Sequence, residues 1–334
     1  MDAETGPSPG GPVGGPVREP VRPLAAADVV ARAAAVLART PAPRRIATRG
    51  GDVECAVVGD GTGAPPVLAL HGLLAGYDQA ALHAACALGD GYRIVAPSRP
   101  GYLGTPLSVG ASPAEQADVW ANLLDALDIP SVAVAAFSAG SLSAFEFAVR
   151  HPDRCRGLVL VSACAARLDT AAPGWLHVLA LISKIPPLAR WLARQAVQNL
   201  ERAAVRPIAD PAMRARLLAD PEAAALFAAN LQSGMNRLAA RLPGSRADHA
   251  RLVALTDLPL ARIAVPVLVV HGTADPYVPF AHAEILAAAI PGAETMTIAG
   301  GEHSCLFTHH AEIEARVRPF LAGLFPDCPA VPVA

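Results

Sequence analysis

Lysine is almost absent from this sequence of 334 residues, because Lys184 is the only one and every other basic side chain is arginine. A pyridoxal Schiff base and a Walker phosphate loop both need a positioned lysine. Lys184 lies between Ser183 and Ile185, and no glycine-rich loop stands beside it. The sequence therefore argues against both mechanisms.

Charged residues are also scarce, at 17% of the chain, and the formal net charge is −2. A nucleic-acid-binding protein usually carries a basic patch or stripe, so we expect no nucleic-acid partner. Hydrophobic residues make up 53% of the chain, which is enough for a sizeable buried core and argues against global disorder.

No CxxC pair occurs among the six cysteines, so the sequence indicates neither a zinc site nor a thioredoxin-like motif. The even number would permit three disulfides. Free buried thiols are favoured instead, because the cysteines lie in apolar contexts in a large domain, and this agrees with a reducing compartment. The cysteines are Cys55, Cys86, Cys155, Cys164, Cys305 and Cys328.

The first residues lack the basic start and apolar run of a secretory signal. The most apolar early stretch, Leu24 to Leu37, is interrupted by Asp28 and Arg32 and is too short and too polar to span a bilayer. We therefore expect a cytoplasmic protein without a membrane span.

Short apolar runs alternate with helix-like stretches, which predicts an α/β fold with a mostly parallel sheet between helices. Two further β-like runs, Arg45 to Thr48 and Asp52 to Val58, are joined by two glycines and predict a hairpin. Ser112, Pro113 and Glu115 form a start signal for a helix that extends to Leu127. The expected strands are Val67–Leu70, Tyr92–Ala96, Ser131–Phe137, Gly157–Ser162, Val265–Val270 and Thr295–Ile298.

The alternation breaks in the middle of the chain, where only proline-punctuated helical segments follow one another. This pattern predicts a helical cap inserted into one α/β domain. The expected organisation is a disordered tail at 1–23, a core at 24–165 and 259–326 that includes an N-terminal helix, a cap at 166–258, and a tail at 327–334.

A serine, an acid and a histidine each follow an expected strand: Ser138, Asp275 and His303. In an open parallel sheet, functional groups gather beyond the carboxyl ends of the strands. Ser138 lies in a small-x-Ser-x-small pattern between a strand and a helix, as expected for a nucleophile on a tight turn. The alternatives are a helix-capping serine, a turn aspartate and a surface histidine. Asp169 is the reserve acid.

His309 and His310 begin the last expected helix without carboxylates in ligand spacing. We therefore expect them to be solvated, and we expect neither a metal nor a cofactor.

Five motifs occur along the chain: His71-Gly72-Leu73, Ser98-Arg99-Pro100-Gly101-Tyr102, Ala136-Phe137-Ser138-Ala139-Gly140 (where alanine replaces the usual first glycine), His271-Gly272-Thr273-Ala274-Asp275 and Gly301-Glu302-His303. Together they resemble the α/β-hydrolase superfamily from about residue 43 to 325, and Tyr77-Asp78-Gln79 resembles a bacterial subgroup of it. The resemblance implies a catalytic triad of Ser138, Asp275 and His303, with an oxyanion hole made by the N–H groups of Leu73 and Ala139. Because the nucleophile position holds serine, epoxide hydrolases and dehalogenases, which use aspartate there, are disfavoured.

The expected cap is rich in apolar side chains, above all between Trp175 and Leu192. If these side chains close over Ser138, Trp175 and Trp191 contact the pocket, and the substrate is an ester with a hydrophobic acyl or alkyl group. Alternatively they pack the cap onto the core. The cap also carries twelve basic residues against seven acidic ones, through surface snorkelling or to steer an anionic substrate.

The sequence therefore predicts a serine hydrolase that cleaves a carboxylic ester of a small molecule through an acyl-enzyme. Two alternatives stay open. One is a biosynthetic cyclase, lyase or acyltransferase with the same triad, and the other is a non-catalytic sensor of a small molecule. The oligomeric state is not predicted.

Overall fold

The computed structural model describes residues 25–59, 63–168 and 174–328. The predicted tail at 1–23, most of the tail at 327–334, and Asp169 lie outside these ranges. Among the described residues, no helix has the length and apolar content needed to cross a bilayer.

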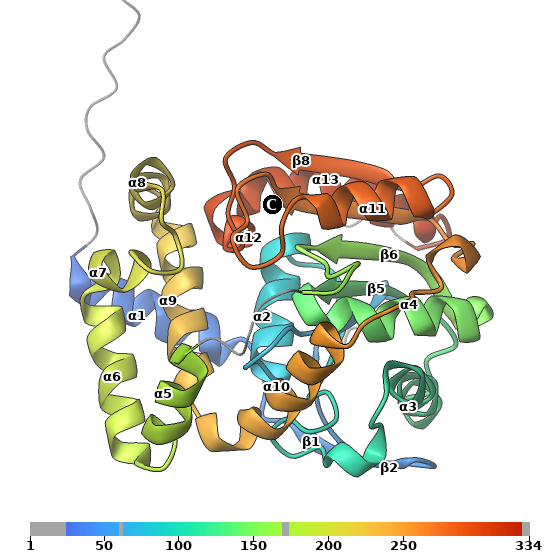
Figure 1. The fold of residues 1–334 in the computed structure, drawn as a ribbon, viewed down its shortest axis with the longest axis horizontal. Coiled ribbons are helices and arrows are strands. Elements are labelled where there is room, and N and C mark those ends of the chain that lie inside the picture. The colour runs from blue at the N-terminus through green and yellow to red at the C-terminus, as the bar shows by residue number, and fades with distance from the viewer. Residues whose placement is uncertain (1–24, 60–62, 169–173, 329–334) are drawn as a thin grey trace, which may run out of the picture.

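The described strands form one eight-stranded sheet in the order β1-β2-β4-β3-β5-β6-β7-β8 (Figure 1). The predicted hairpin is confirmed, since β1 and β2 pair antiparallel, and β2 is the strand that runs against all the others. The predicted mostly parallel α/β sheet is therefore confirmed. The strands are β1 (Arg44–Thr48), β2 (Gly51–Val58), β3 (Pro66–Leu70), β4 (Arg93–Pro97), β5 (Val132–Phe137), β6 (Cys155–Val161), β7 (Val267–Gly272) and β8 (Glu294–Ile298).

Strand β5 shows why these apolar runs become central strands. All six of its residues are buried, and alternate residues enter different hydrophobic clusters on the two faces of the sheet. Helices α2 and α13 cover one face, and α3, α4 and α11 cover the other. These helices are α2 (Tyr77–Leu88), α3 (Pro113–Ala126), α4 (Ser141–Arg150), α11 (Ala281–Ala289) and α13 (His310–Leu324), and α12 (Cys305–Thr308) precedes α13.

The helix start predicted at Ser112 is confirmed. Helix α3 begins with a capping box, in which the Ser112 side chain accepts from the Glu115 amide and the Glu115 carboxylate accepts from the Ser112 amide. Five of the six cysteines are buried and Cys328 is half-buried, and all six are free thiols.

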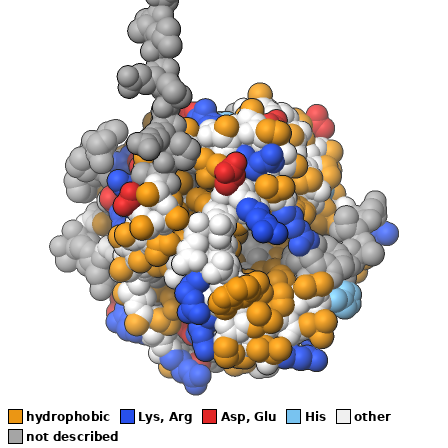
Figure 2. Space-filling model, turned by 90° about the vertical axis from the view of Figure 1, so that its left-hand side faces the viewer, with side chains coloured by type: hydrophobic (Ala, Val, Ile, Leu, Met, Phe, Trp, Pro, Cys, Tyr) orange, Lys and Arg blue, Asp and Glu red, His pale blue; other side chains and the backbone are white. Residues whose placement is uncertain are grey.

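Between β6 and β7 the described chain forms only helices. These are α5 (Gly174–Ile182), α6 (Pro186–Gln198), α7 (Leu200–Ala204), α8 (Pro211–Ala219), α9 (Pro221–Met235) and α10 (Leu238–Val253), with the short turn η4 (Leu260–Arg262) before β7. Helices α8 and α9 each begin with an aspartate cap followed by proline. On the side where α6 and α7 lie, hydrophobic side chains are exposed among Lys and Arg (Figure 2).

The N-terminal helix α1 (Ala26–Ala38) was expected to belong to the core, but it packs mainly against α9 and α6 of the insertion. It buries Val29 and Ala33. The apolar spacing predicted the helix and its buried face, but that spacing does not reveal which surface the face will meet.

Candidate functional site

Ser138 lies on a sharp turn between β5 and α4. It is the first residue of the helical turn η2 (Ser138–Gly140), and its φ of +50° is in the left-handed region that non-glycine residues rarely adopt. Two glycines let this turn approach the loop after β3. A Cβ on Gly140 would lie 2.4 Å from the carbonyl oxygen of Leu70, and one on Gly72 would lie 3.1 Å from Cβ of Ser138. The turn therefore holds the serine above the sheet edge.

Asp275 and His303 come together because β7 and β8 are parallel neighbours, so that the loops after them share one edge. Nδ1 of His303 lies 2.7 Å from Oδ2 of Asp275, while Oδ1 of Asp275 accepts from the amides of Tyr277 and Val278, both at 2.9 Å. Burial raises the pKa of Asp275, but the hydrogen bonds from His303 and the two amides lower it by more. The pKa of Asp275 is therefore below its ordinary value. Asp275 is therefore an ionised, fixed acceptor for the Nδ1 proton.

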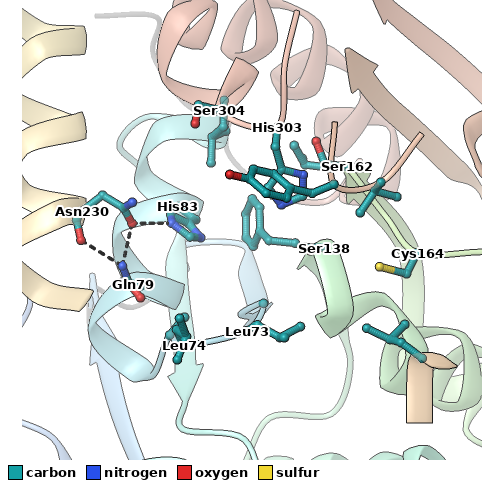
Figure 3. A pocket seen from close by; sticks show the side chains of 18 of the residues that line it. Leu73, Leu74, Gln79, His83, Ser138, Ser162, Cys164, Asn230, His303 and Ser304 are labelled. Carbon is teal, nitrogen blue, oxygen red and sulfur yellow. Dashed lines mark hydrogen bonds between the residues drawn. The ribbon is translucent and has the colours of Figure 1, made fainter. Parts of the chain in front are cut away.

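Ser138 and His303 both line one cavity of about 360 Å³, which we call the site cavity (Figure 3). Tyr277 packs edge-on against the His303 ring at a centroid distance of 5.5 Å. Among the described residues no hydrogen bond joins the Ser138 hydroxyl to the His303 ring, and such a bond often tightens only with substrate. Cys164 also lines the cavity, and burial raises the pKa of its thiol to about 12, so that it stays neutral.

The loop after β3 is shaped by a buried, neutral histidine. Burial lowers the pKa of His71 well below its ordinary value, and Nε2 of the ring accepts from the amide of Arg99 at 2.9 Å. The proton therefore lies on Nδ1, which donates to the carbonyl of Gly72 at 2.8 Å. Because a trans peptide holds its C=O and N–H on opposite sides, the N–H of Leu73 points away from His71.

A polar cluster that the sequence reasoning missed lines another part of the site cavity. Gln79 and His83 lie one turn apart on α2, and both donate to the side-chain oxygen of Asn230 on α9, at 2.8 and 2.9 Å (Figure 3). The Tyr-Asp-Gln step was the available signal, but nothing in it identified Asn230, which lies 151 residues after Gln79.

The insertion is fastened to the loops at the sheet edge by charged groups, which the sequence reasoning also missed. Asp248 of α10 is buried and accepts from Arg99 and from the hydroxyl of Tyr102. Arg241 of α10 pairs with Asp78 at 2.6 Å. Glu302, beside His303, accepts from the amides of Ala209 and Asp210 before α8.

The expectation that the stretch around Trp191 reaches the pocket is wrong. The cap contributes Leu168, Asn230, His249 and Leu252 to the site cavity, but none of the described side chains between residues 177 and 192 reaches it. Trp191 is 50% exposed, because α6 turns this side chain to solvent, and the side chain of Trp175 lies outside the described part.

His310 is buried rather than solvated. Its Nε2 lies 3.1 Å from Oδ2 of Asp220, the residue that caps α9. The carboxylate partner comes from a distant helix, and spacing along the last helix could not reveal it. Among the described residues no three His, Cys, Asp or Glu side chains are grouped as a metal site.

Comparison with known proteins agrees with this architecture. Residues 65–310 match the model of the alpha/beta hydrolase fold. A solved structure of an alpha/beta hydrolase fold protein from Nakamurella multipartita is 32% identical, with a TM-score of 0.73 over 84% of this chain and 98% of that one.

Two curated relatives are named as hydrolases. An uncharacterized hydrolase of Bacillus subtilis, YcgS, is 35% identical over 43% of this chain and 49% of that protein, so this chain spans about half the length of that relative. A pimeloyl-[acyl-carrier protein] methyl ester esterase of Aromatoleum aromaticum is 29% identical over 70% of this chain and 89% of its own length. Because the matched region runs from β3 to the start of α13 and includes Ser138, Asp275 and His303, the chain belongs to the α/β-hydrolase fold family of enzymes.

Proposed function

We propose that this chain is a serine hydrolase that cleaves carboxylic esters of small molecules, with Ser138 as nucleophile, His303 as general base and Asp275 as the carboxylate that orients the histidine. The main support is that Ser138, on its strained turn, shares the site cavity with a histidine whose Nδ1 is held by a buried carboxylate. The name of the Aromatoleum relative, a methyl ester esterase, supports ester hydrolysis as the reaction class.

The hydrogen bond between Asp275 and His303 supports this chemistry. Because Asp275 accepts the Nδ1 proton, Nε2 of His303 keeps its lone pair and takes the Ser138 proton as the oxygen attacks the ester carbonyl. The tetrahedral intermediate then expels the alcohol, which receives that proton from His303, and an acyl-enzyme remains. A water molecule, deprotonated by His303, releases the acid and restores Ser138.

The N–H groups of Leu73 and Ala139 form the oxyanion hole in this proposal. The His71–Gly72 hydrogen bond turns the Leu73 N–H away from His71, and Ala139 is the second residue of a helical turn, where N–H groups have no partner within the turn. Each donor aimed at the oxyanion is worth about 3–4 kcal/mol of transition-state stabilisation in comparable sites.

We also propose that the insertion at 166–258 acts as a cap that shapes the substrate pocket. Four of its residues line the site cavity, and its charged contacts fasten it to the loop that carries His303 and to the loop after β4. A cap in this position excludes water and completes the pocket.

A fluorophosphonate probe tests the nucleophile directly, since it reacts with an activated serine. We expect one labelled site, at Ser138 by peptide mass spectrometry, and no labelling of Ser138→Ala. The matched control is Ser143→Ala, which removes a buried hydroxyl on α4 that does not line the site cavity. A wild-type protein that stays unlabelled, or that is labelled equally after Ser138→Ala, would remove Ser138 as nucleophile.

Turnover of p-nitrophenyl esters tests the reaction. Ser138→Ala should lower kcat by about 10⁴-fold or more, because the three groups act as a unit. A labelled serine without turnover of any ester would instead favour acyl transfer or another biosynthetic step.

A further inference from the structure

The polar cluster of Gln79, His83 and Asn230 forms one wall of the site cavity, which we call the polar wall. It has no role in the mechanism above. Gln79, His83 and Asn230 lie together on the α2 and α9 side, whereas Ser138 and His303 lie on loops at the sheet edge (Figure 3). Most of the remaining wall is apolar, with side chains such as Leu74, Phe137, Leu252, Leu306 and Phe307. Burying a polar group in such a wall costs free energy unless the group has a hydrogen-bond partner.

The hydrogen bonds define how the Gln79 and Asn230 amides are oriented and which nitrogen of His83 carries the proton. The side-chain oxygen of Asn230 accepts from Nε2 of Gln79, so the proton shared with His83 must come from Nε2 of the histidine. His83 is therefore the neutral tautomer with a lone pair on Nδ1. Burial lowers the pKa of His83 to about 4, which keeps the ring neutral at pH 7.

Three hydrogen-bonding groups have no partner after these bonds are formed. Within the described chain, Nδ1 of His83 is buried without a partner, and the Asn230 side-chain NH₂ and the Gln79 side-chain oxygen make no hydrogen bond. The wall thus offers one donor group, the Asn230 NH₂, and one acceptor, the Gln79 oxygen, and the unpartnered Nδ1 of His83 belongs to the same cluster. A hydroxyl, which both donates and accepts, matches that set.

Charge excludes the ionic alternatives. No Asp, Glu, Lys or Arg is among the described residues that line the site cavity. A charged substrate group placed against this wall would be desolvated without a counter-ion, which is strongly unfavourable. The wall therefore selects a neutral polar group.

A purely structural role, in which these side chains only hold α2 against the insertion, explains the polar wall less well than ligand binding does. Asp78, the residue before Gln79, already joins α2 to the insertion by its ion pair with Arg241, and neither residue of that pair lines the site cavity. The Gln79 amide lies close to Gly234, where an added Cβ would lie 3.3 Å from Nε2. Helix α9 is thus brought near enough for Asn230 to present its amide at the cavity wall.

We propose, on the basis of the ester hydrolysis proposed above, that Gln79, His83 and Asn230 form a specificity subsite that binds a hydroxyl group of the substrate. The substrate class is then a neutral hydroxylated ester rather than a plain alkyl ester. The hydroxyl is carried on either the acid or the alcohol portion, and the test distinguishes the two.

Pairs of esters that differ only by hydroxyl in place of terminal methyl provide the test. One series contains methyl esters of ω-hydroxy acids, the other contains ω-hydroxyalkyl acetates, and each has its methyl-terminated counterpart across a range of chain lengths. Hydrolysis is followed by proton release. We expect wild-type kcat/KM to favour the hydroxyl compound by about tenfold or more at one chain length in one series.

Asn230→Leu should lower that preference to near one, and His83→Phe, which keeps a ring between Phe137 and Phe307, should lower it at least fivefold. The matched control is Gln232→Leu, the same kind of change on α9, two residues away and outside the site cavity. It should keep the wild-type preference. Thermal unfolding checks that each variant is folded, and the ratio of two substrates cancels any loss of active protein.

Two outcomes overturn the subsite. One is hydrolysis of methyl-terminated esters without a hydroxyl preference at any length, and the other is a preference that survives both Asn230→Leu and His83→Phe. Either result leaves ester hydrolysis standing. If the wild-type protein hydrolyses neither member of any pair, the proposed function fails, and this inference fails with it.

Discussion

The sheet and the helical insertion differ in how much their buried contacts depend on charged and polar groups. Strands β5 and β7 are buried at every residue, and the hydrophobic effect holds them in place. The insertion exposes Val178, Leu181 and Trp191 and reaches the sheet edge through buried charged and polar contacts such as Arg99–Asp248. The insertion also shares a buried apolar cluster with the core, through side chains such as Leu217 and Phe227. The sheet is thus fixed mainly by apolar burial, and the insertion is joined to the core by apolar burial together with directional bonds.

The same division runs through the site cavity. Loops of the α/β core carry Ser138, Asp275 and His303, while α9 and α10 contribute Asn230, His249 and Leu252. Chemistry is therefore proposed to reside in the α/β core and substrate selection partly in the insertion. Each of the following changes tests one side of that division.

The strongest of these changes is predicted in the core. Asp275→Asn should lower kcat for p-nitrophenyl esters by about 10⁴-fold, because an amide at this position favours the tautomer with the proton on Nε2 of His303, which cannot accept the serine proton. Steady-state kinetics measures this. Asp257→Asn, an exposed acid before β7, is the control, and a loss of less than tenfold for Asp275→Asn would mean that another acid orients His303.

The second effect lies at the junction of the two parts. Asp248→Asn should lower the free energy of unfolding by roughly 3–5 kcal/mol, because it leaves the buried guanidinium of Arg99 without a counter-ion. Denaturant unfolding measures the change. Asp118→Asn, which breaks the exposed pair with Arg150, should cost less than about 1 kcal/mol. Equal losses of unfolding free energy in the two variants would show that the Arg99–Asp248 pair stabilises the protein no more than the exposed pair does.

The third effect depends on pH and arises where α2 meets α9. The pKa of His83 is about 4 in the folded chain against an ordinary value of 6.5. Between these pH values the unfolded chain binds a proton that the folded chain does not, so stability falls as the pH drops from 6.5 to 4, by about 3 kcal/mol from this one group.

His83→Gln should make that decline shallower, although His71, whose pKa burial also lowers, preserves part of it. Urea unfolding at several pH values gives the slope, with the exposed His177→Gln as control. An unchanged slope in His83→Gln would mean that the ring is protonated in the folded state.

The smallest effect lies on the outer surface of the insertion. Trp191→Ala should change kcat/KM by less than about twofold, because this half-exposed side chain does not line the site cavity. Leu252→Ala, which enlarges the cavity at a buried position on α10, should instead shift the preferred ester size. A larger effect from Trp191→Ala would indicate that α6 closes onto the cavity during turnover.

The core and the positions of the proposed catalytic groups could be predicted from the amino-acid sequence. Apolar runs such as Val132–Phe137 predict buried strands, and the capping box at Ser112 predicts where α3 begins. Because parallel strands end at one edge, the order of Ser138, Asp275 and His303 was enough to expect them at that edge. The hydrogen bond between Asp275 and His303 agrees with that expectation.

The way in which the insertion meets this edge depends on tertiary contacts that the sequence does not reveal. The apolar stretch around Trp191 was expected over the cavity, yet α9 and α10 line it instead. Periodicity shows which face of a helix is apolar, but it does not show which surface that face meets, as α1 also demonstrates by packing on α9. Asn230 and Asp248 lie about 150 residues from Gln79 and Arg99, and polar pairs over such separations leave no periodic trace, because each is formed only when the chain has folded.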